Sequence, residues 1–227
     1  LLYDPGTRWS YSVAVDIQGY IVQKLSGQKF GDYLKANVFT PLGMNDTSFR
    51  PKLSERIAPT EDGLRGVVHD PTARRMGGVA GHAGMFTTVA DLAKFARAVL
   101  GGKFFPHGMT EIASPPDVLV KRMAGFDVDS NYSRPRGDLF PQGSFGHTGW
   151  TGGFFWIDLS SHTFYVFLSN RVHPDGKGSV VALQHRLGTL VAESLTAVTF
   201  TPPVRRVGYV LGGADAQNGI DVLHAGG

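Results

Sequence analysis

The first regular pattern along the chain is an apolar residue at every fourth position, from Val13 through Ile17 and Ile21 to Leu25. A helix with 3.6 residues per turn brings such positions onto one face, so the pattern predicts an amphipathic helix. Gly27 follows closely, and a glycine just after the last apolar position is typical of a helix end. We therefore expect the first helix to end there.

Apolar residues three or four positions apart predict three further helices, over residues 30–38, 89–100 and 181–195. The helix over 89–100 has the clearest start. Thr88 is a good N-cap, and Asp91 stands three residues on, in the position of a capping box. These two residues should fix the first turn of that helix.

Strand signals are concentrated near the end of the chain. Residues 154–158 and 163–170 are aromatic and β-branched runs joined by the short polar segment 159–162, which predicts a β-hairpin. Residues 50–85 and 103–144 have no clear period, so we expect them to be irregular. Irregular segments of this length in compact domains are often functional.

Composition narrows the class of protein. The chain has 227 residues, 42% of them hydrophobic, with 30 Gly, 13 Pro and no Cys. This length fits one large domain or two small ones, and the apolar content is ample for a core, which excludes disorder for the bulk of the chain. The absence of Cys excludes a disulfide scaffold, a thiolate metal site and a Cys nucleophile.

Charge argues against two kinds of partner. The net charge is +3 and only 18% of residues are charged. Lys and Arg occur in scattered pairs without an aromatic-interleaved stripe, so no nucleic acid partner is expected. The longest apolar runs fall far short of the ~20 residues of a membrane span, so no membrane-spanning segment is expected.

Common catalytic motifs are mostly absent. There is no G-x-S-x-G, H-E-x-x-H, P-loop or G-x-G-x-x-G sequence. Four histidines and an aspartate could in principle meet at a metal, but nothing in their spacing demands it, so we expect neither a metal nor a cofactor. These five residues are His69, Asp70, His82, His147 and His173.

Two local features remain as candidate chemistry. Tyr11 stands at the start of the first predicted helix, where it could be a general base if nearby cations lower its pKa, or an aromatic packed on the core. Residues 146–150, Gly-His-Thr-Gly-Trp, enter the predicted hairpin. Small residues at a strand edge could let a substrate lie against the backbone, or could simply form a glycine-rich turn.

A third feature is expected to be without function. Ser26 and Lys29 match the S-x-x-K motif of serine acylases, in which the amine must reach the hydroxyl from one turn away on the same helix. Gly27 stands between them and is expected to break the helix.

Taken together, these pieces resemble the serine hydrolases related to class C β-lactamases, penicillin-binding proteins and the esterases that share their fold. The likeness covers about residues 3–195. It rests on the order and spacing of the following segments: 5–13, 25–34, 38–47, 77–88, 91–95, 146–149 and 156–158. The resemblance implies an α/β (α+β type), β-lactamase/transpeptidase-like domain, with an antiparallel sheet flanked by helices.

The resemblance also implies a mechanism. In this family a Ser of S-x-x-K is acylated, its Lys and the Tyr of a Y-x-N motif manage the proton, and a K-T-G strand supplies an oxyanion N–H. By position Tyr11 matches the Tyr, and His147, Thr148 and Gly149 match K-T-G. The catalytic residues implied here are Tyr11, His147 and Trp150, whose backbone N–H would be the oxyanion donor.

Two departures from the family pattern bear on the substrate. Val13 stands where β-lactamases have an Asn that holds the acyl amide. His147 replaces Lys, so the positive charge near a substrate carboxylate depends on pH. Both changes favour an esterase or a D-amino-acid peptidase over an efficient β-lactamase. Thr148, Gly149, Val13 and His82 are the implied substrate-binding residues, although His82 could equally make a hydrogen bond that organises its glycine-rich loop.

The S-x-x-K helix of the family would precede Leu1, so we expect residues 1–200 to be a partial domain whose N-terminal part, with the nucleophile, is missing. The expected partner is therefore the missing segment. Alone, these residues should be inactive and should leave apolar surface uncovered. A non-catalytic, penicillin-recognising or scaffold module of the same fold is the alternative, which the sequence upstream of Leu1 would resolve.

Residues 201–227 are expected to be a linker and the start of a following domain. The segment 218–223 resembles the opening of exo-acting N-acetylmuramidase domains. Such a fusion makes a small-molecule or peptidoglycan-derived substrate plausible, with export of the full-length protein to the periplasm or the exterior.

Overall fold

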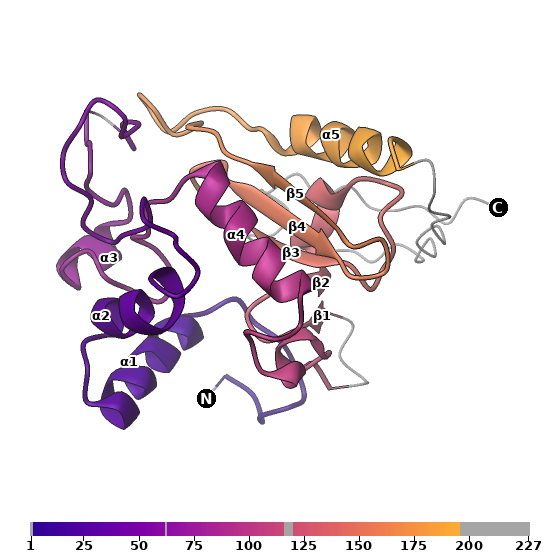
Figure 1. Cartoon of the computed structure of the whole chain (residues 1–227), viewed down its shortest axis with the longest axis horizontal. Coiled ribbons are helices and arrows are strands. Elements are labelled where there is room, and N and C mark those ends of the chain that lie inside the picture. Colours follow the sequence, from indigo (N-terminus) through magenta and orange to yellow (C-terminus); the bar gives the residue numbers. More distant parts are fainter. Residues whose placement is uncertain (1, 62, 116–119, 196–227) are drawn as a thin grey trace.

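A computed structural model describes residues 2–61, 63–115 and 120–195 (Figure 1). The predicted division at residue 201 therefore lies outside the described residues and stays a prediction. The elements, in chain order, are α1 (Ala14–Ser26), α2 (Phe30–Leu34), a π-helical turn η1 (Lys35–Phe39), α3 (Pro71–Arg75), α4 (Val89–Leu100), a 3-10 turn η2 (His107–Thr110), β1 (Lys121–Arg122), β2 (Asp127–Asp129), a 3-10 turn η3 (Asn131–Arg136), β3 (Phe145–Thr148), β4 (Phe154–Asp158), β5 (Thr163–Phe167) and α5 (Val181–Glu193).

The five strands form one antiparallel sheet in the order β1-β2-β3-β4-β5, with helices on both sides (Figure 1). The predicted hairpin is confirmed, with Phe154 opposite Phe167 and Asp158 opposite Thr163. The expected irregularity of residues 103–144 is only partly right, because β1 and β2 lie there. Strands of two and three residues are too short to carry an alternating pattern, so only their neighbours in the sheet define them.

Both faces of β4 are buried, by different helices. Phe154 and Trp156 pack in a cluster with Ala192 of α5, whereas Ile157 packs in a second cluster with Val99 of α4. Alternate residues of a strand point to opposite faces, so the aromatic run fills core on both sides of the sheet. Its aromatic side chains are core residues and do not form a platform for substrate.

The first helix forms as predicted, but its apolar stripe is exposed. Gly27 adopts a left-handed conformation (φ 68°), and its N–H bonds to the carbonyl of Gln23, which ends α1. Ile17, with 56% of its surface exposed, and Leu25, with 85%, do not pack into the core of the described residues. The periodicity thus marks an apolar face that this structure leaves open.

The capping prediction for α4 is half right. The Thr88 hydroxyl accepts a hydrogen bond from the Asp91 N–H at 3.2 Å. The carboxylate of Asp91 is buried and does not reach back to Thr88; it accepts hydrogen bonds from the Asp46 N–H (2.8 Å), the Thr47 hydroxyl (2.9 Å) and the Lys94 ammonium (2.8 Å). Asp91 therefore joins α4 to the turn at Asp46.

The expected irregularity of residues 50–85 overlooked one short helix, α3. Asp70 caps it by accepting a hydrogen bond from the Ala73 N–H at 2.7 Å, and Pro71 occupies its first turn. A five-residue helix has no periodic apolar face, so only these end signals could have identified it. None of the helices in the described ranges has the length and apolar character that crossing a membrane requires.

Candidate active site

Tyr11 lies outside the core, at the exposed edge of an aromatic cluster. It is 60% exposed, and its ring contacts the half-buried rings of Trp9 (6.0 Å between centroids) and Tyr132 (5.4 Å). Trp9 in turn stacks under the guanidinium of Arg122 at 5.0 Å, and that guanidinium pairs with Asp127. Among the described residues, the Tyr11 hydroxyl has no hydrogen-bond partner, so it is open to a reacting group.

Tyr132, which contacts Tyr11, belongs to an element that packs against the strand carrying the other predicted residues. Tyr132 belongs to η3, which packs against β3, the strand of His147 and Thr148. Sequence reasoning missed Tyr132, because it lies in a segment without periodicity. No local signal separates it from the other aromatic residues, and only the fold brings it beside Tyr11.

His147 is oriented by its own strand. Its Nδ1 lies 2.6 Å from the backbone oxygen of Thr148. A carbonyl oxygen only accepts, so Nδ1 donates this hydrogen bond. The side chain is half-buried. Nε2 is therefore the ring nitrogen of His147 that is left for a ligand.

The turn after β3 is fixed at several points. The Gly149 N–H bonds to the Gly153 carbonyl at 2.7 Å, and the Gly152 N–H bonds to the Gly149 carbonyl at 2.9 Å. Gly152 has a φ of 95°, and a Cβ there would lie 2.2 Å from the Ser169 hydroxyl. At the outer end, Trp150 is 65% exposed, and its backbone N–H has no acceptor among the described residues. It has the properties of an oxyanion donor: held in place and unpaired.

The two glycines that flank His147 and Thr148 have different roles. A Cβ at Gly146 would lie 2.1 Å from the carbonyl oxygen of Phe155 in β4, and this close approach is enough to require a glycine at position 146. A Cβ at Gly149 would meet its nearest neighbour at 3.7 Å, which is an ordinary contact. Gly146 is thus explained by the close approach of the neighbouring strand, whereas the contacts around Gly149 do not by themselves require a glycine.

His82 makes the hydrogen bonds that organise its loop. Its Nδ1 lies 2.8 Å from Asp16 in α1, and its Nε2 lies 2.9 Å from Asp70 at the cap of α3. Both partners are carboxylates, so both ring nitrogens donate and the ring is an imidazolium. Burial by itself lowers the pKa of His82, but the hydrogen bonds and charges of Asp16 and Asp70 outweigh it and raise the pKa above its usual value.

This arrangement limits what His82 can offer a substrate. Both ring nitrogens are used within the protein, so a substrate would have to displace Asp16 or Asp70 to bond with the ring. The loop is also close to α1, because a Cβ at Gly81 would lie 2.0 Å from the carbonyl oxygen of Val15. Val13, by contrast, precedes α1 with its side chain 64% exposed and makes no side-chain cap.

Two other predictions concern alternative chemistry. Ser26 is the last residue of α1, Gly27 breaks the helix, and Lys29 precedes α2, so the S-x-x-K match does not put Ser and Lys on one helix, as expected. Within the described ranges no group of three or more His, Asp or Glu side chains could hold a metal ion.

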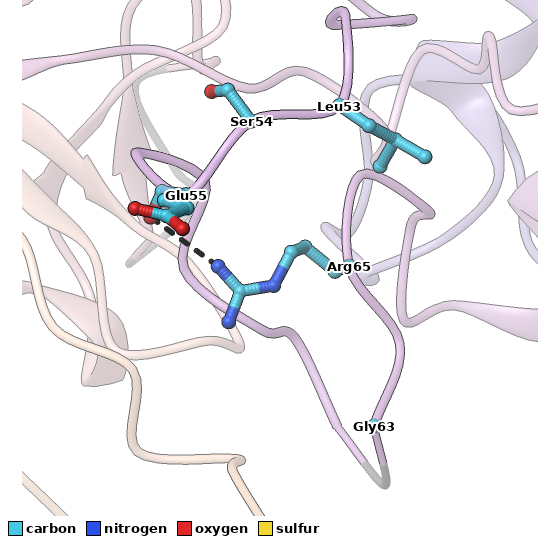
Figure 2. Close-up of a pocket in the computed structure, with 5 residues that line it drawn as sticks. All are labelled: Leu53, Ser54, Glu55, Gly63 and Arg65. Atoms are coloured by element: carbon cyan, nitrogen blue, oxygen red, sulfur yellow. Dashed lines mark hydrogen bonds between the residues drawn. The ribbon is translucent and has the colours of Figure 1, made fainter.

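Surface pockets lie in the described part of the chain, and two of them differ in their relation to the predicted site. One, of about 610 Å³, is lined by Leu53, Ser54, Glu55, Gly63 and Arg65, with Arg65 donating to the backbone oxygen of Glu55 at 3.3 Å (Figure 2). None of the predicted site residues lines it. The other, of about 250 Å³, borders the aromatic cluster through Trp9 and is lined by Arg8, Trp9, Ala113, Ser114, Pro115, Arg122 and Met123.

Comparison with known proteins gives the family. The family model described as Beta-lactamase matches residues 1–189. A protein of Escherichia coli O157:H7 named "Putative D-alanyl-D-alanine carboxypeptidase" is 31% identical over 207 residues, covering 76% of this chain and 47% of the relative. The chain thus spans about half the length of this curated relative.

Solved structures agree on the fold. A β-lactamase from Mycobacterium bovis superimposes with a TM-score of 0.64 at 26% identity, over 86% of this chain and 67% of that one. Simvastatin synthase from Aspergillus terreus gives a TM-score of 0.63 at 16% identity, over 86% and 58% respectively, a likeness of fold alone. The antiparallel sheet, the flanking helices and the match over residues 1–189 together show that this chain belongs to the β-lactamase family.

Proposed function

We propose that this chain supplies the proton-transfer and oxyanion-binding residues of a serine hydrolase that acts by acyl transfer. The Ser nucleophile and its Lys would come from an S-x-x-K segment preceding Leu1. The observation that carries the proposal is the turn at 149–153, whose exposed Trp150 N–H is unpaired among the described residues while the backbone around it is fixed. A preorganised donor of this kind stabilises the charge of a tetrahedral intermediate.

Tyr11 is the proposed general base. Its exposed hydroxyl could take the Ser proton as the Ser oxygen attacks the carbonyl carbon, and return it to the leaving alcohol or amine. Water then attacks the acyl-enzyme by the reverse route. A tyrosine needs a neighbouring cation to act as a base near neutral pH, and the Lys of the preceding segment would provide it.

The proposed substrates are esters and peptides ending in a D-amino acid, in preference to penicillins as substrates for turnover. Val13 has no amide group with which to hold an acyl amide. His147 would contact a substrate carboxylate only through Nε2, and with a positive charge only when protonated. The name of the Escherichia coli relative, a putative D-alanyl-D-alanine carboxypeptidase, supports a peptide that ends in D-alanine. Export of the whole protein is part of the same proposal.

The exposed stripe of α1 supports a preceding segment as the partner. Ile17, Ile21 and Leu25 are 56%, 47% and 85% exposed along one helix face. An exposed apolar patch on a folded domain usually marks a contact site. The preceding segment would cover this face and bring the nucleophile toward Tyr11.

Acyl-enzyme labelling tests the proposed function. The chain is expressed alone and as the longer protein, extended upstream to include the S-x-x-K segment, and each is treated with a fluorophosphonate and with a penicillin. We expect mass spectrometry to find one adduct per longer protein, none on the isolated chain, and none after the motif Ser is replaced by Ala. An adduct on the isolated chain would contradict the proposal. Absence of Ser and Lys three residues apart upstream would instead favour the non-catalytic, penicillin-recognising or scaffold module.

A further inference from the structure

Arg171, which follows β5, contacts the turn at 149–153 in three ways. Its Nε donates to the Trp150 carbonyl at 2.7 Å, and its guanidinium lies 4.4 Å from the centroid of the Trp150 ring. Its backbone N–H donates to the Thr151 carbonyl at 3.1 Å. One residue thus fixes both the backbone and the side chain of Trp150, the proposed oxyanion donor.

The guanidinium also reaches a second segment. Its Nη1 donates to the carbonyls of Gly176 (3.3 Å) and Gly178 (3.1 Å), which lie in the loop before α5. Within the described part of the chain, every hydrogen bond of this side chain goes to a backbone carbonyl. Arg171 therefore joins two loops, and the charge that it places beside Trp150 is not neutralised by a carboxylate in those hydrogen bonds.

The inner side of the same turn is held separately. The Gly152 carbonyl accepts hydrogen bonds from the Ser169 hydroxyl and from the buried Gln184 amide, both at 2.9 Å. Ser169 and Gln184 therefore fix the turn where it is buried, whereas Arg171 fixes it where Trp150 is exposed. Without the Arg171 side chain, the exposed end would keep its own turn hydrogen bonds and the backbone bond from position 171 to the Thr151 carbonyl.

We propose that Arg171 is a positioning residue, which holds Trp150 so that its N–H is aimed at the developing oxyanion. This role rests on the proposed function of the turn. Arg171 acts through the carbonyl and the indole of Trp150 and need not touch the substrate. Because an oxyanion donor is useful only at a fixed position, loosening the turn should slow the chemical step more than it weakens substrate binding.

The first experiment measures the turn itself and needs no activity. Amide hydrogen exchange is followed in the longer protein for wild type, Arg171→Ala and Arg171→Lys. The Gly149 and Gly152 amides, which are bonded within the turn, should exchange at least about tenfold faster in Arg171→Ala and by an intermediate factor in Arg171→Lys. Amides of β4 should be unchanged, which shows that the variant is folded. Unchanged exchange at Gly149 and Gly152 would overturn the proposal.

Arg97→Ala is the matched control. Arg97 also stacks on an aromatic ring, that of Phe164 at 5.7 Å, but lies on α4 and makes no contact with the turn. Its removal tests whether the loss of any stacked arginine loosens the chain. Exchange at Gly149 and Gly152 should stay at the wild-type rate in this variant, and an equal acceleration in both variants would overturn the assignment to Arg171.

The second experiment uses the longer protein with an activated ester. Arg171→Ala should lower kcat by about tenfold to a hundredfold, with KM within about threefold of wild type, and Arg171→Lys should recover part of kcat. A change in KM at constant kcat would make Arg171 a substrate-binding residue and overturn the positioning role. A wild-type longer protein that neither labels nor turns over would refute the proposed function, while the exchange result would still stand on its own.

Discussion

At the scale of single residues, the proposed site depends on groups that are exposed to solvent but fixed in position by neighbouring side chains. Tyr11 is open to solvent, yet its ring rests on Trp9 and Tyr132. Trp150 is equally open, and Arg171 holds it by its carbonyl and its ring. An exposed group held by neighbours can meet a substrate without the entropic cost of ordering it at each turnover.

Replacing Tyr11 by Phe should remove the proposed base while keeping the ring contacts. In the longer protein we expect deacylation to slow by about 10²- to 10⁴-fold, the usual contribution of general acid–base catalysis. The unfolding midpoint should not change, because the hydroxyl has no partner among the described residues. Tyr20→Phe is the control, since Tyr20 is 55% exposed on α1 and lies outside the proposed machinery. A loss below about tenfold for Tyr11→Phe, measured by acyl-enzyme lifetime, would rule out Tyr11 as the base.

At the scale of elements, charged side chains connect segments that are distant in sequence. The His82 imidazolium joins α1 to the cap of α3 through Asp16 and Asp70. Asp91 joins α4 to the turn at Asp46. Hydrogen bonds with a charged partner are stronger than neutral ones, so these contacts determine how the loops sit on the helices.

The His82 contact should make stability depend on pH on the alkaline side. Its pKa in the folded protein is raised, so its contribution is fully present below the unfolded value of about 6.5 and is lost as the pH rises through the folded value. We expect an NMR titration of the His82 ring to give a pKa above that of an unfolded histidine. The free energy of unfolding of wild type should approach that of His82→Gln as the pH rises from 6 to 9. A His82 pKa below the unfolded value would exclude the charged contact.

Asp91 should matter most above its own pKa. Burial raises the pKa of Asp91, but hydrogen bonds from Lys94, Thr47 and Asp46 outweigh it and lower the pKa. The stabilisation is therefore present above the unfolded pKa of about 3.9 and is lost as the pH falls through the folded value.

Urea unfolding at pH 7, where the stabilisation by Asp91 should be fully present, measures its size through the variant Asp91→Asn. We expect a loss of about 2 kcal/mol, because the variant loses the charge that Lys94 faces and weakens the bonds to Asp46 and Thr47. Asp32→Asn, an exposed aspartate in the first turn of α2, should change stability by less than about 0.5 kcal/mol. Equal effects of the two substitutions would show that Asp91 contributes no more than a surface charge.

At the scale of the whole molecule, the described residues cover both faces of the sheet but leave the apolar stripe of α1 exposed. α4 and α5 pack on opposite faces of β4 (Figure 1). Within the described residues, Ile17 and Leu25 of the α1 stripe stay 56% and 85% exposed. The chain spans about half the length of its curated relative, of which it covers 47%.

The uncovered stripe predicts a difference between the isolated chain and the longer protein. The isolated chain should bind the dye ANS and self-associate, and Ile17→Glu should reduce both, because a charge breaks the apolar stripe. In the longer protein, the same change should lower the unfolding midpoint, since it would bury a charge. Met76→Glu, at a site 46% exposed in the turn after α3, should do neither. Equal dye binding by the isolated chain and the longer protein would argue against a covering segment.

The site illustrates what a sequence can supply. Tyr11 and residues 147–150 were found from the order of short motifs, and their roles remain proposals. Tyr132 and Arg171 could not be found that way, because neither lies in a motif and each acts through a ring or carbonyl far away in the chain. His82 was identified as important, but only the fold showed that both its nitrogens are paired.

The sequence by itself determined α1, α4, α5 and the β4–β5 hairpin, because local periodicity and end residues specify these elements within about a dozen positions. The tertiary structure decided the rest. β1 and β2 are defined only by their pairing with a neighbouring strand. The Asp91 carboxylate accepts a hydrogen bond from the Asp46 N–H, 45 residues away, and does not complete the cap of its own helix. Contacts of this range depend on how the chain closes on itself, which no local pattern encodes.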